Sequence, residues 1–196
     1  MTDVRINRTP RSKEWIVTAL FQLMEHQEYS AISILQIADK AGVVRQTFYR
    51  NYKEKDDVLF EYMTDRFKEF LGGFGANKEL SLQLFVSLFD KWKQRSPSSL
   101  ILNVHNRDRK IRQILFRSLD QCIEQFIEGA SDPKDSKRRE RSDDDRFYYA
   151  RRSLSSVIHV MLVDWTLSGF RLPAEEMAHI CYQLTSSMRE EVYRAL

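Results

Sequence analysis

The sequence predicts an all-α fold of about nine helices, and two observations support this class. Apolar residues recur almost throughout the 196 residues at the i, i+3, i+4, i+7 spacing of an amphipathic helix. Glycine and proline are scarce, with six and four residues, so few positions interrupt a helix. We expect a three-helix N-terminal unit, joined by a fourth helix to a larger helical domain, with residues 1–71 forming the first domain and 72–196 the second.

The composition excludes several classes of protein. With 42% hydrophobic and 30% charged residues, the chain can bury a core and is not of the disordered class. Cys122 and Cys181 lack the spacing of a disulfide framework or a zinc site, and we expect neither a metal nor a cofactor. The N-terminus has no apolar leader, and no run of ~18 apolar residues suggests a membrane span. We therefore expect a cytoplasmic protein.

The first two helices have clear starts and ends. The apolar positions from Trp15 to Met24 predict a helix from about Pro10 to His26. Ser33 and Gln36 have the spacing of a capping box, which predicts the start of a second helix. Gly42 ends that helix, since glycine readily takes the left-handed conformation that a tight turn needs.

A third helix begins directly after this turn and runs to Tyr52. Two short helices so close in sequence must cross at a steep angle, which is the geometry of a helix-turn-helix. Phe48 can then turn inward with Val43. Four side chains face outward: Arg45, Gln46, Thr47 and Tyr49.

The outward side chains match the chemistry of DNA bases. Arginine suits guanine O6 and N7, glutamine suits adenine N6 and N7, and a threonine methyl can meet a thymine methyl. The alternative is an ordinary solvated surface, but Thr47 and Tyr49 suit bases and phosphates better than they suit solubility. The net charge of +3 is too small to identify a nucleic-acid binder. Residues 1–71 are neutral overall, yet basic residues concentrate in two places, as DNA contact requires. These places are the leading arm, with Arg5, Arg8, Arg11 and Lys13, and the surroundings of the third helix, with Arg45, Arg50, Lys53 and Lys55.

Three segments in combination resemble the DNA-binding domain of the tetracycline-repressor (TetR) family. They are ILQIADKAGV at 34–43, TFYRNY at 47–52 and KDDVL at 55–59. The resemblance covers roughly residues 9–69. It implies that Arg45, Gln46 and Thr47 address the major groove and that Tyr49 and Lys55 contact the DNA backbone. The full set of expected DNA contacts is Ser33, Arg45, Gln46, Thr47, Tyr49, Arg50, Asn51, Tyr52 and Lys55.

Two positions depart from the family pattern. Val44 stands where the family usually has a serine that caps the recognition helix, and Gln46 replaces a residue that is commonly small. The missing cap should cost about 1 kcal/mol of local helix stability. The longer Gln46 side chain adds reach toward a base.

The rest of the chain continues as helices. The fourth runs from Lys53 to Leu71 and ends at glycines, which form a connector and not a phosphate loop, because the spacing of a phosphate-binding motif is missing. Later helices are expected at about 80–95, 100–105, 111–129, 147–169 and from Pro173 onward. The charged segment from Ser131 to Arg146 is expected to be an exposed loop. Its basic run could touch DNA, but the adjacent aspartates favour a solvated loop.

The last two predicted helices are more apolar than a monomer of this size needs. In TetR-like proteins the corresponding helices build a four-helix dimer interface, so the resemblance implies a homodimer. A protein that binds two DNA half-sites also needs two copies of the recognition helix. The expected interface residues are Val157, Met161, Met177, Ile180, Cys181, Leu184 and Met188.

The resemblance also implies a cavity for a small effector among the central helices. An aromatic stripe at helical spacing is more often core, and the histidines at 105 and 159 are more often structural than ligand contacts. The candidate lining residues are Phe85, Phe89, Trp92, Phe116, Phe126, His159, Met161 and Trp165.

The sequence favours one of three classes of function. The first, a sequence-specific regulator that represses from a palindromic operator on double-stranded DNA and responds to an effector, fits the motifs best. An enzyme is disfavoured, because the sequence has no metalloprotease motif, nucleophile elbow or metal-spaced cluster. A TetR-like protein that works by protein–protein interaction remains the alternative, although the presence of Arg45, Thr47, Tyr49 and Lys55 argues against a loss of DNA binding.

Overall fold

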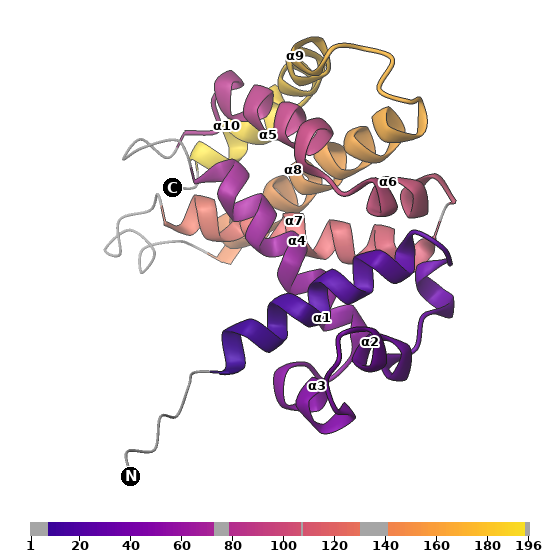
Figure 1. Cartoon of the computed structure of the whole chain (residues 1–196). Helices are drawn as coiled ribbons and strands as arrows, with labels where there is room; N and C mark the ends of the chain where they lie inside the picture. The colour runs from indigo at the N-terminus through magenta and orange to yellow at the C-terminus, as the bar shows by residue number, and fades with distance from the viewer. Residues whose placement is uncertain (1–7, 73–78, 107, 130–140, 195–196) are drawn as a thin grey trace.

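The computed structural model describes residues 8–72, 79–106, 108–129 and 141–194, with side chains for all of these except residues 8–10 and 141–144. In these ranges the chain is all-helical and contains no strand, as the sequence predicts. Figure 1 shows the arrangement. The elements are α1 (Arg8–Met24), the 3-10 turn η1 (Tyr29–Ala31), α2 (Ile34–Lys40), α3 (Arg45–Asn51), α4 (Lys55–Leu71), α5 (Leu82–Arg95), α6 (Ser98–His105), α7 (Arg109–Glu128), α8 (Arg141–Leu167), α9 (Ala174–Leu184) and α10 (Ser186–Arg194).

The C-terminal helix divides into two, which the sequence pattern did not reveal. At Thr185 the backbone leaves the helical conformation, and the Thr185 hydroxyl donates a hydrogen bond to the Cys181 carbonyl over 2.7 Å. A threonine hydroxyl that bonds a carbonyl four residues back competes with the backbone ladder and often bends a helix. The chain therefore has ten α-helices in the part that the structure describes.

The predicted loop at 131–146 was wrong for its last six residues. Residues 131–140 lie outside the described ranges, but α8 already begins at Arg141. Asp145 and Arg146 are exposed, and the Arg146 guanidinium lies 3.4 Å from the Glu191 carboxylate on α10. Asp145 and Arg146 thus belong to an exposed helix surface and not to irregular backbone.

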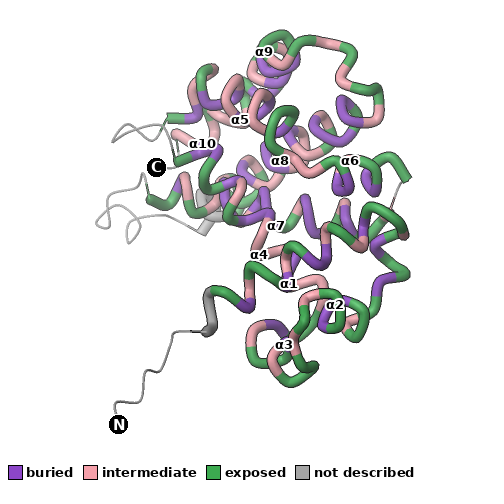
Figure 2. Tube along the Cα trace, viewed as in Figure 1, coloured by how far each residue is buried: buried purple, intermediate pink, exposed green. Residues whose placement is uncertain are grey.

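The helices at the two ends of the molecule are joined by a central pair. Helices α1, α2 and α3 lie at one end of the molecule and α5 and α9 at the other, with α4 and α7 packed together between them (Figure 1). Buried residues line the inner faces of the central helices, whereas α2 and α3 are mostly exposed (Figure 2). The helix-turn-helix thus lies at the surface, next to the packed helices α1 and α4.

A buried ion-pair network fixes α8 against α7. The Arg151 side chain is buried, and its guanidinium lies 2.8 Å from the Asp120 carboxylate and 3.0 Å from that of Glu124. Arg152 forms a second ion pair with Asp120. A buried charge is tolerated when it is paired and hydrogen-bonded, as here. The network therefore sets how the long α8 sits on the central helices.

A buried asparagine joins the N-terminal region to α6. The Asn103 Oδ1 atom accepts a hydrogen bond from the Tyr29 backbone N–H over 2.8 Å. Its Nδ2 atom donates to the Met24 carbonyl over 3.1 Å and to the Ser99 carbonyl over 2.9 Å. One side chain thus satisfies the backbone at the end of α1 and at the start of η1.

Candidate nucleic-acid interface

The turn between α2 and α3 is built by local hydrogen bonds that the sequence predicted. The Ser33 backbone donates to the Gln36 side chain over 2.8 Å, and the Gln36 backbone donates to the Ser33 hydroxyl over 3.3 Å, which completes the capping box. Gly42 has a φ of 65°, and the next residue, Val43, donates back to the Ala38 carbonyl over 3.0 Å. This left-handed residue ends α2 and redirects the chain into α3.

One side of α3 is anchored in the core while the other faces solvent. Phe48 is fully buried, and Val44, at the N-cap, makes no side-chain capping bond, as its residue type predicts. Thr47 is half-buried. The exposed residues of α3 include three with strong hydrogen-bond donors or acceptors, Arg45, Gln46 and Arg50, together with Tyr49.

Two exposed side chains of α3 contact each other. The Arg45 Nη2 atom donates to the Tyr49 hydroxyl over 3.1 Å, and the guanidinium carbon lies 5.4 Å from the centroid of the tyrosine ring. The Tyr49 ring also packs edge-on against Phe48, with centroids 5.8 Å apart. The buried Phe48 thus supports Tyr49, which in turn contacts Arg45.

Two residues of the expected contact set turn inward. Tyr52 is only 5% exposed, and its hydroxyl lies 3.4 Å from the Glu61 carboxylate. The Asn51 amide donates to the Thr47 carbonyl over 2.7 Å and to the Ser12 hydroxyl over 3.2 Å, which ties α3 to α1. The expectation of DNA contact at Tyr52 does not fit this burial, since its position at the end of α3 returns it to the core. Asn51 likewise holds α3 in place.

Lys55 is occupied by the protein itself. Its ammonium donates to the carbonyls of Tyr29, Ser30 and Ile32 over 2.7, 3.0 and 2.6 Å. It also lies 4.8 Å from the Tyr29 ring centroid. Burial lowers the pKa of Lys55, while nearby Asp56 opposes that shift. All three N–H donors are used, so the geometry gives Lys55 a structural role and not the backbone contact that the family resemblance implies.

A signal for this role was present in the sequence. A lysine in the first turn of a helix opposes the helix dipole, so its charge needs other partners. Here the partners are the carbonyls around η1, which only the tertiary structure brings close. Next to the Lys55 ammonium, the Tyr29 hydroxyl donates to the Asp56 carboxylate over 2.6 Å. Burial, together with this carboxylate, raises the pKa of Tyr29.

The basic residues around α3 divide into paired and exposed ones. The Lys13 ammonium on α1 lies 2.8 Å from the Glu61 carboxylate on α4, which neutralises its charge. Arg11, Arg50 and Lys53 are exposed. The leading-arm positions Arg5 and Arg8 were also expected near DNA, but Arg5 and the side chain of Arg8 lie outside the described part of the structure.

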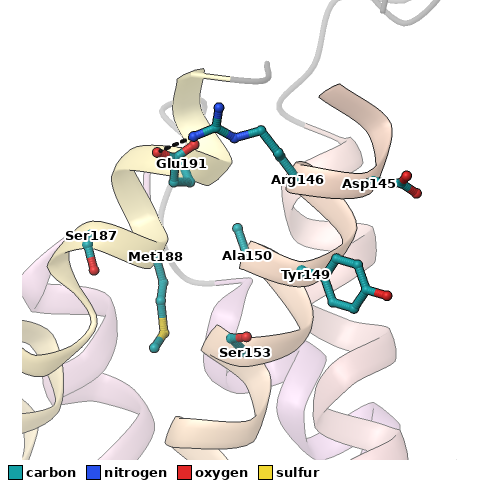
Figure 3. A pocket seen from close by; sticks show the side chains of 8 residues that line it. All are labelled: Asp145, Arg146, Tyr149, Ala150, Ser153, Ser187, Met188 and Glu191. Carbon is teal, nitrogen blue, oxygen red and sulfur yellow. Dashed lines mark hydrogen bonds and ion pairs between the residues drawn. The ribbon is translucent and has the colours of Figure 1, made fainter. Parts of the chain in front are cut away.

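A second exposed surface lies at the C-terminal end, on α8, α9 and α10. Val160 is 52% exposed and Leu184 is 64% exposed, although both are large and apolar. A groove runs between α8 and α10, where Met188 lies opposite Ala150 (Figure 3). The groove is lined by Asp145, Arg146, Tyr149, Ala150, Ser153, Ser187, Met188 and Glu191.

The expected dimer residues fall on two faces of the C-terminal helices. Val157, Met161, Ile180 and Met188 are half-buried and Leu184 is exposed, so these side chains remain accessible. Met177 and Cys181 are buried within the same subunit, in the part of the chain where α9 packs on α5, and burial raises the pKa of Cys181 to about 12. The expectation for these two does not fit this burial, since they lie one turn apart on the face of α9 that packs on α5. Sequence reasoning missed Val160, which follows Val157 at helical spacing.

The expected effector residues divide into buried and half-buried ones. Four are buried and packed: Phe89 lies edge-on to Trp165, with centroids 5.5 Å apart, and Trp92 stacks on Phe67 at 6.3 Å. The Trp92 indole N–H donates to the Thr166 hydroxyl over 3.0 Å. Phe85 lies edge-on to Tyr182 at 5.5 Å.

The other four expected effector residues are half-buried, namely Phe116, Phe126, His159 and Met161. Phe116 lies between His159, at 5.4 Å between ring centroids, and Arg152, whose guanidinium carbon is 4.4 Å from the ring centroid. Burial lowers the pKa of His159. Phe126 and Met161 pack against the core. This arrangement favours the interpretation of the aromatic stripe as core.

The described ranges contain neither a cluster of metal ligands nor a membrane-spanning helix. No group of three His, Cys, Asp or Glu side chains there lies close enough to hold a metal ion. None of the helices described has the length and apolar character to span a bilayer.

Residues 16–62 match the family model described as "Bacterial regulatory proteins, tetR family". This match confirms the resemblance for the segment that contains α2 and α3. A search of curated proteins found no match.

Solved structures of transcription regulators share the fold over nearly the whole chain. A TetR transcriptional regulator from Streptococcus agalactiae is 17% identical, with a TM-score of 0.60 over 91% of this chain and 95% of its own. The dihydroxyacetone kinase operon activator DhaS is 14% identical, with a TM-score of 0.55 over 91% and 96%. FadR of Thermus thermophilus, a TetR-family repressor solved with lauroyl-CoA, is 19% identical, with a TM-score of 0.54 over 89% and 93%.

Proposed function

We propose that the protein is a cytoplasmic, non-enzymatic transcription regulator that binds a palindromic operator as a homodimer, and the premise is the match of residues 16–62 to the tetR-family model. The observation that carries the proposal is the exposed, donor-rich face of α3, held by the fully buried Phe48. Arginine and glutamine on such a face can read guanine and adenine in the major groove. The proposed contact set is Ser33, Arg45, Gln46, Thr47, Tyr49 and Arg50.

We propose that dimerisation uses the outward face of α8, α9 and α10. One short helix contacts few bases, so two recognition helices a helical turn of DNA apart are needed for specificity. The exposed apolar side chains of Val160 and Leu184 would be buried in such a contact, together with the groove beside Met188. A dimer that covers two half-sites excludes other proteins from the same DNA. We therefore propose that the protein is a repressor.

We further propose that a small apolar effector modulates DNA affinity through the aromatic core. Phe89, Trp92 and Trp165 join α5 to α8, and α6 links the same region to η1 through Asn103. A molecule that entered this core would separate aromatic contacts that are now closed. It would change DNA affinity only if it bound one arrangement of these helices better than another.

Selection of binding sites from random duplex DNA tests the proposed function. The wild-type protein should select a palindrome with half-sites about one helical turn apart. Arg45→Ala should keep the palindrome but relax the preference at one base pair per half-site, a loss of about 1 to 3 kcal/mol of discrimination. The measurement is the sequence preference of each variant in parallel selections.

A matched arginine controls for loss of charge. Arg171 is also exposed but lies after α8, and Figure 1 places that segment far from α3. Arg171→Ala should select the same sequences as the wild type. An Arg45→Ala variant with an unchanged preference would contradict the assignment of α3 as the recognition helix.

A further inference from the structure

The contact between Arg45 and Tyr49 is formed by two exposed side chains one helical turn apart. The Arg45 Nη2 atom donates to the Tyr49 hydroxyl over 3.1 Å, and the guanidinium carbon lies 5.4 Å from the ring centroid. Tyr49 is 45% exposed, so water competes for both groups. Arginine loses considerable rotamer freedom when it is held in one position, so this contact restricts a side chain that would otherwise sample many conformations.

The contact leaves the base-reading capacity of Arg45 intact. A guanidinium has five N–H donors, and the hydroxyl of Tyr49 accepts one of them. The remaining donors still include one of the two parallel N–H pairs of the guanidinium, and one such pair is enough to bind O6 and N7 of a guanine. Holding the guanidinium plane before DNA arrives reduces the entropy that is lost on binding.

Tyr49 has support that does not depend on DNA. Its ring packs edge-on against Phe48 at 5.8 Å, and Phe48 is fully buried. The tyrosine ring is therefore a comparatively fixed point on α3, whereas Arg45 is a long and mobile side chain. The buried Phe48 thus supports Tyr49, and Tyr49 in turn restricts Arg45.

We propose that the Tyr49 hydroxyl positions Arg45 and does not contact a phosphate, which makes Tyr49 a determinant of base specificity. This inference rests on the proposed function, since it concerns the same DNA interface. The Tyr49 hydroxyl should then affect DNA affinity through one base pair per half-site, which is the base pair that Arg45 contacts. A hydroxyl that bound only a phosphate would instead affect all sequences equally.

The test is a double-mutant cycle measured on several DNA duplexes. Tyr49→Phe removes the hydroxyl and keeps the ring. Its affinity is compared with that of the wild type on the selected operator, on operators changed at each base pair, and on random DNA. We expect about a fivefold loss on the selected operator, the ratio that corresponds to one hydrogen bond of average net strength. We expect no loss where the base pair contacted by Arg45 is changed, and none on random DNA.

The cycle separates positioning from direct contact. In an Arg45→Ala background, Tyr49→Phe should have no further effect, because the side chain that it positions is gone. In a Gln46→Ala background the fivefold loss should remain, since Gln46 is exposed on the same helix but is not part of the pair. Thermal unfolding of each variant should match that of the wild type, which excludes a folding defect as the cause.

An equal loss on every duplex, unchanged by Arg45→Ala, would overturn the proposal and leave Tyr49 as a phosphate contact. A wild-type protein that selects no sequence would instead overturn the proposed function itself, and this inference with it. These two failures are distinguishable, because the first still yields a palindromic preference for the wild type.

Discussion

Replacing Asn103 with leucine should lower the free energy of unfolding by about 3 kcal/mol. The substitution keeps the branched shape of the side chain but removes both of its polar atoms, so the Tyr29 N–H and the Met24 carbonyl lose their partners in a buried position. Each buried group left without a partner costs about 1 to 3 kcal/mol. Urea unfolding followed by circular dichroism measures the change.

The neighbouring Asn106 supplies the control for this substitution. It ends α6 and is exposed, so Asn106→Leu should change the free energy of unfolding by less than about 0.5 kcal/mol. If Asn103→Leu and Asn106→Leu had equal effects, the junction between α6 and the N-terminal helices would not depend on the Asn103 amide.

Replacing Lys55 with methionine should lower the free energy of unfolding by about 2 kcal/mol. Methionine retains the aliphatic stem but leaves the carbonyls of Tyr29, Ser30 and Ile32 without their charged donor. Hydrogen bonds to charged groups contribute about 1.5 to 3 kcal/mol each, but partial exposure lets water replace part of this set. The same unfolding measurement reports the loss.

Lys53 provides a lysine of the same charge that is exposed two residues earlier. Lys53→Met should leave stability within about 0.5 kcal/mol of the wild type. A Lys55→Met variant with wild-type stability, but with weaker DNA binding and a smaller salt dependence, would show that Lys55 contacts a phosphate after all.

The N-terminal elements could be predicted because their determinants are local. The capping box at Ser33 and the left-handed Gly42 each act within a few residues, and so does the missing cap at Val44. Their effects can therefore be inferred from spacing alone. The inward turn of Phe48 also follows from helical periodicity, once α2 and α3 are placed at a steep angle.

The departures from expectation come from contacts that spacing does not encode. Lys55 finds its partners more than twenty residues away in sequence, and Asn103 finds two of its partners more than seventy residues away. Met177 and Cys181 share helical spacing with the outward residues of α9 but face α5 within their own subunit. An apolar helix that packs on two sides does not reveal from sequence which side meets its own core.

The dependence of DNA affinity on salt tests most directly whether this chain binds duplex DNA through the surface around α3. Wild-type protein is titrated with its selected operator at 50 and at 200 mM monovalent salt. Because Lys and Arg side chains displace counterions from the phosphates, a dimer with many such contacts should bind roughly a thousandfold more weakly, or worse, at the higher concentration. An affinity that stayed the same at both concentrations would contradict operator binding and favour a role in protein–protein interaction.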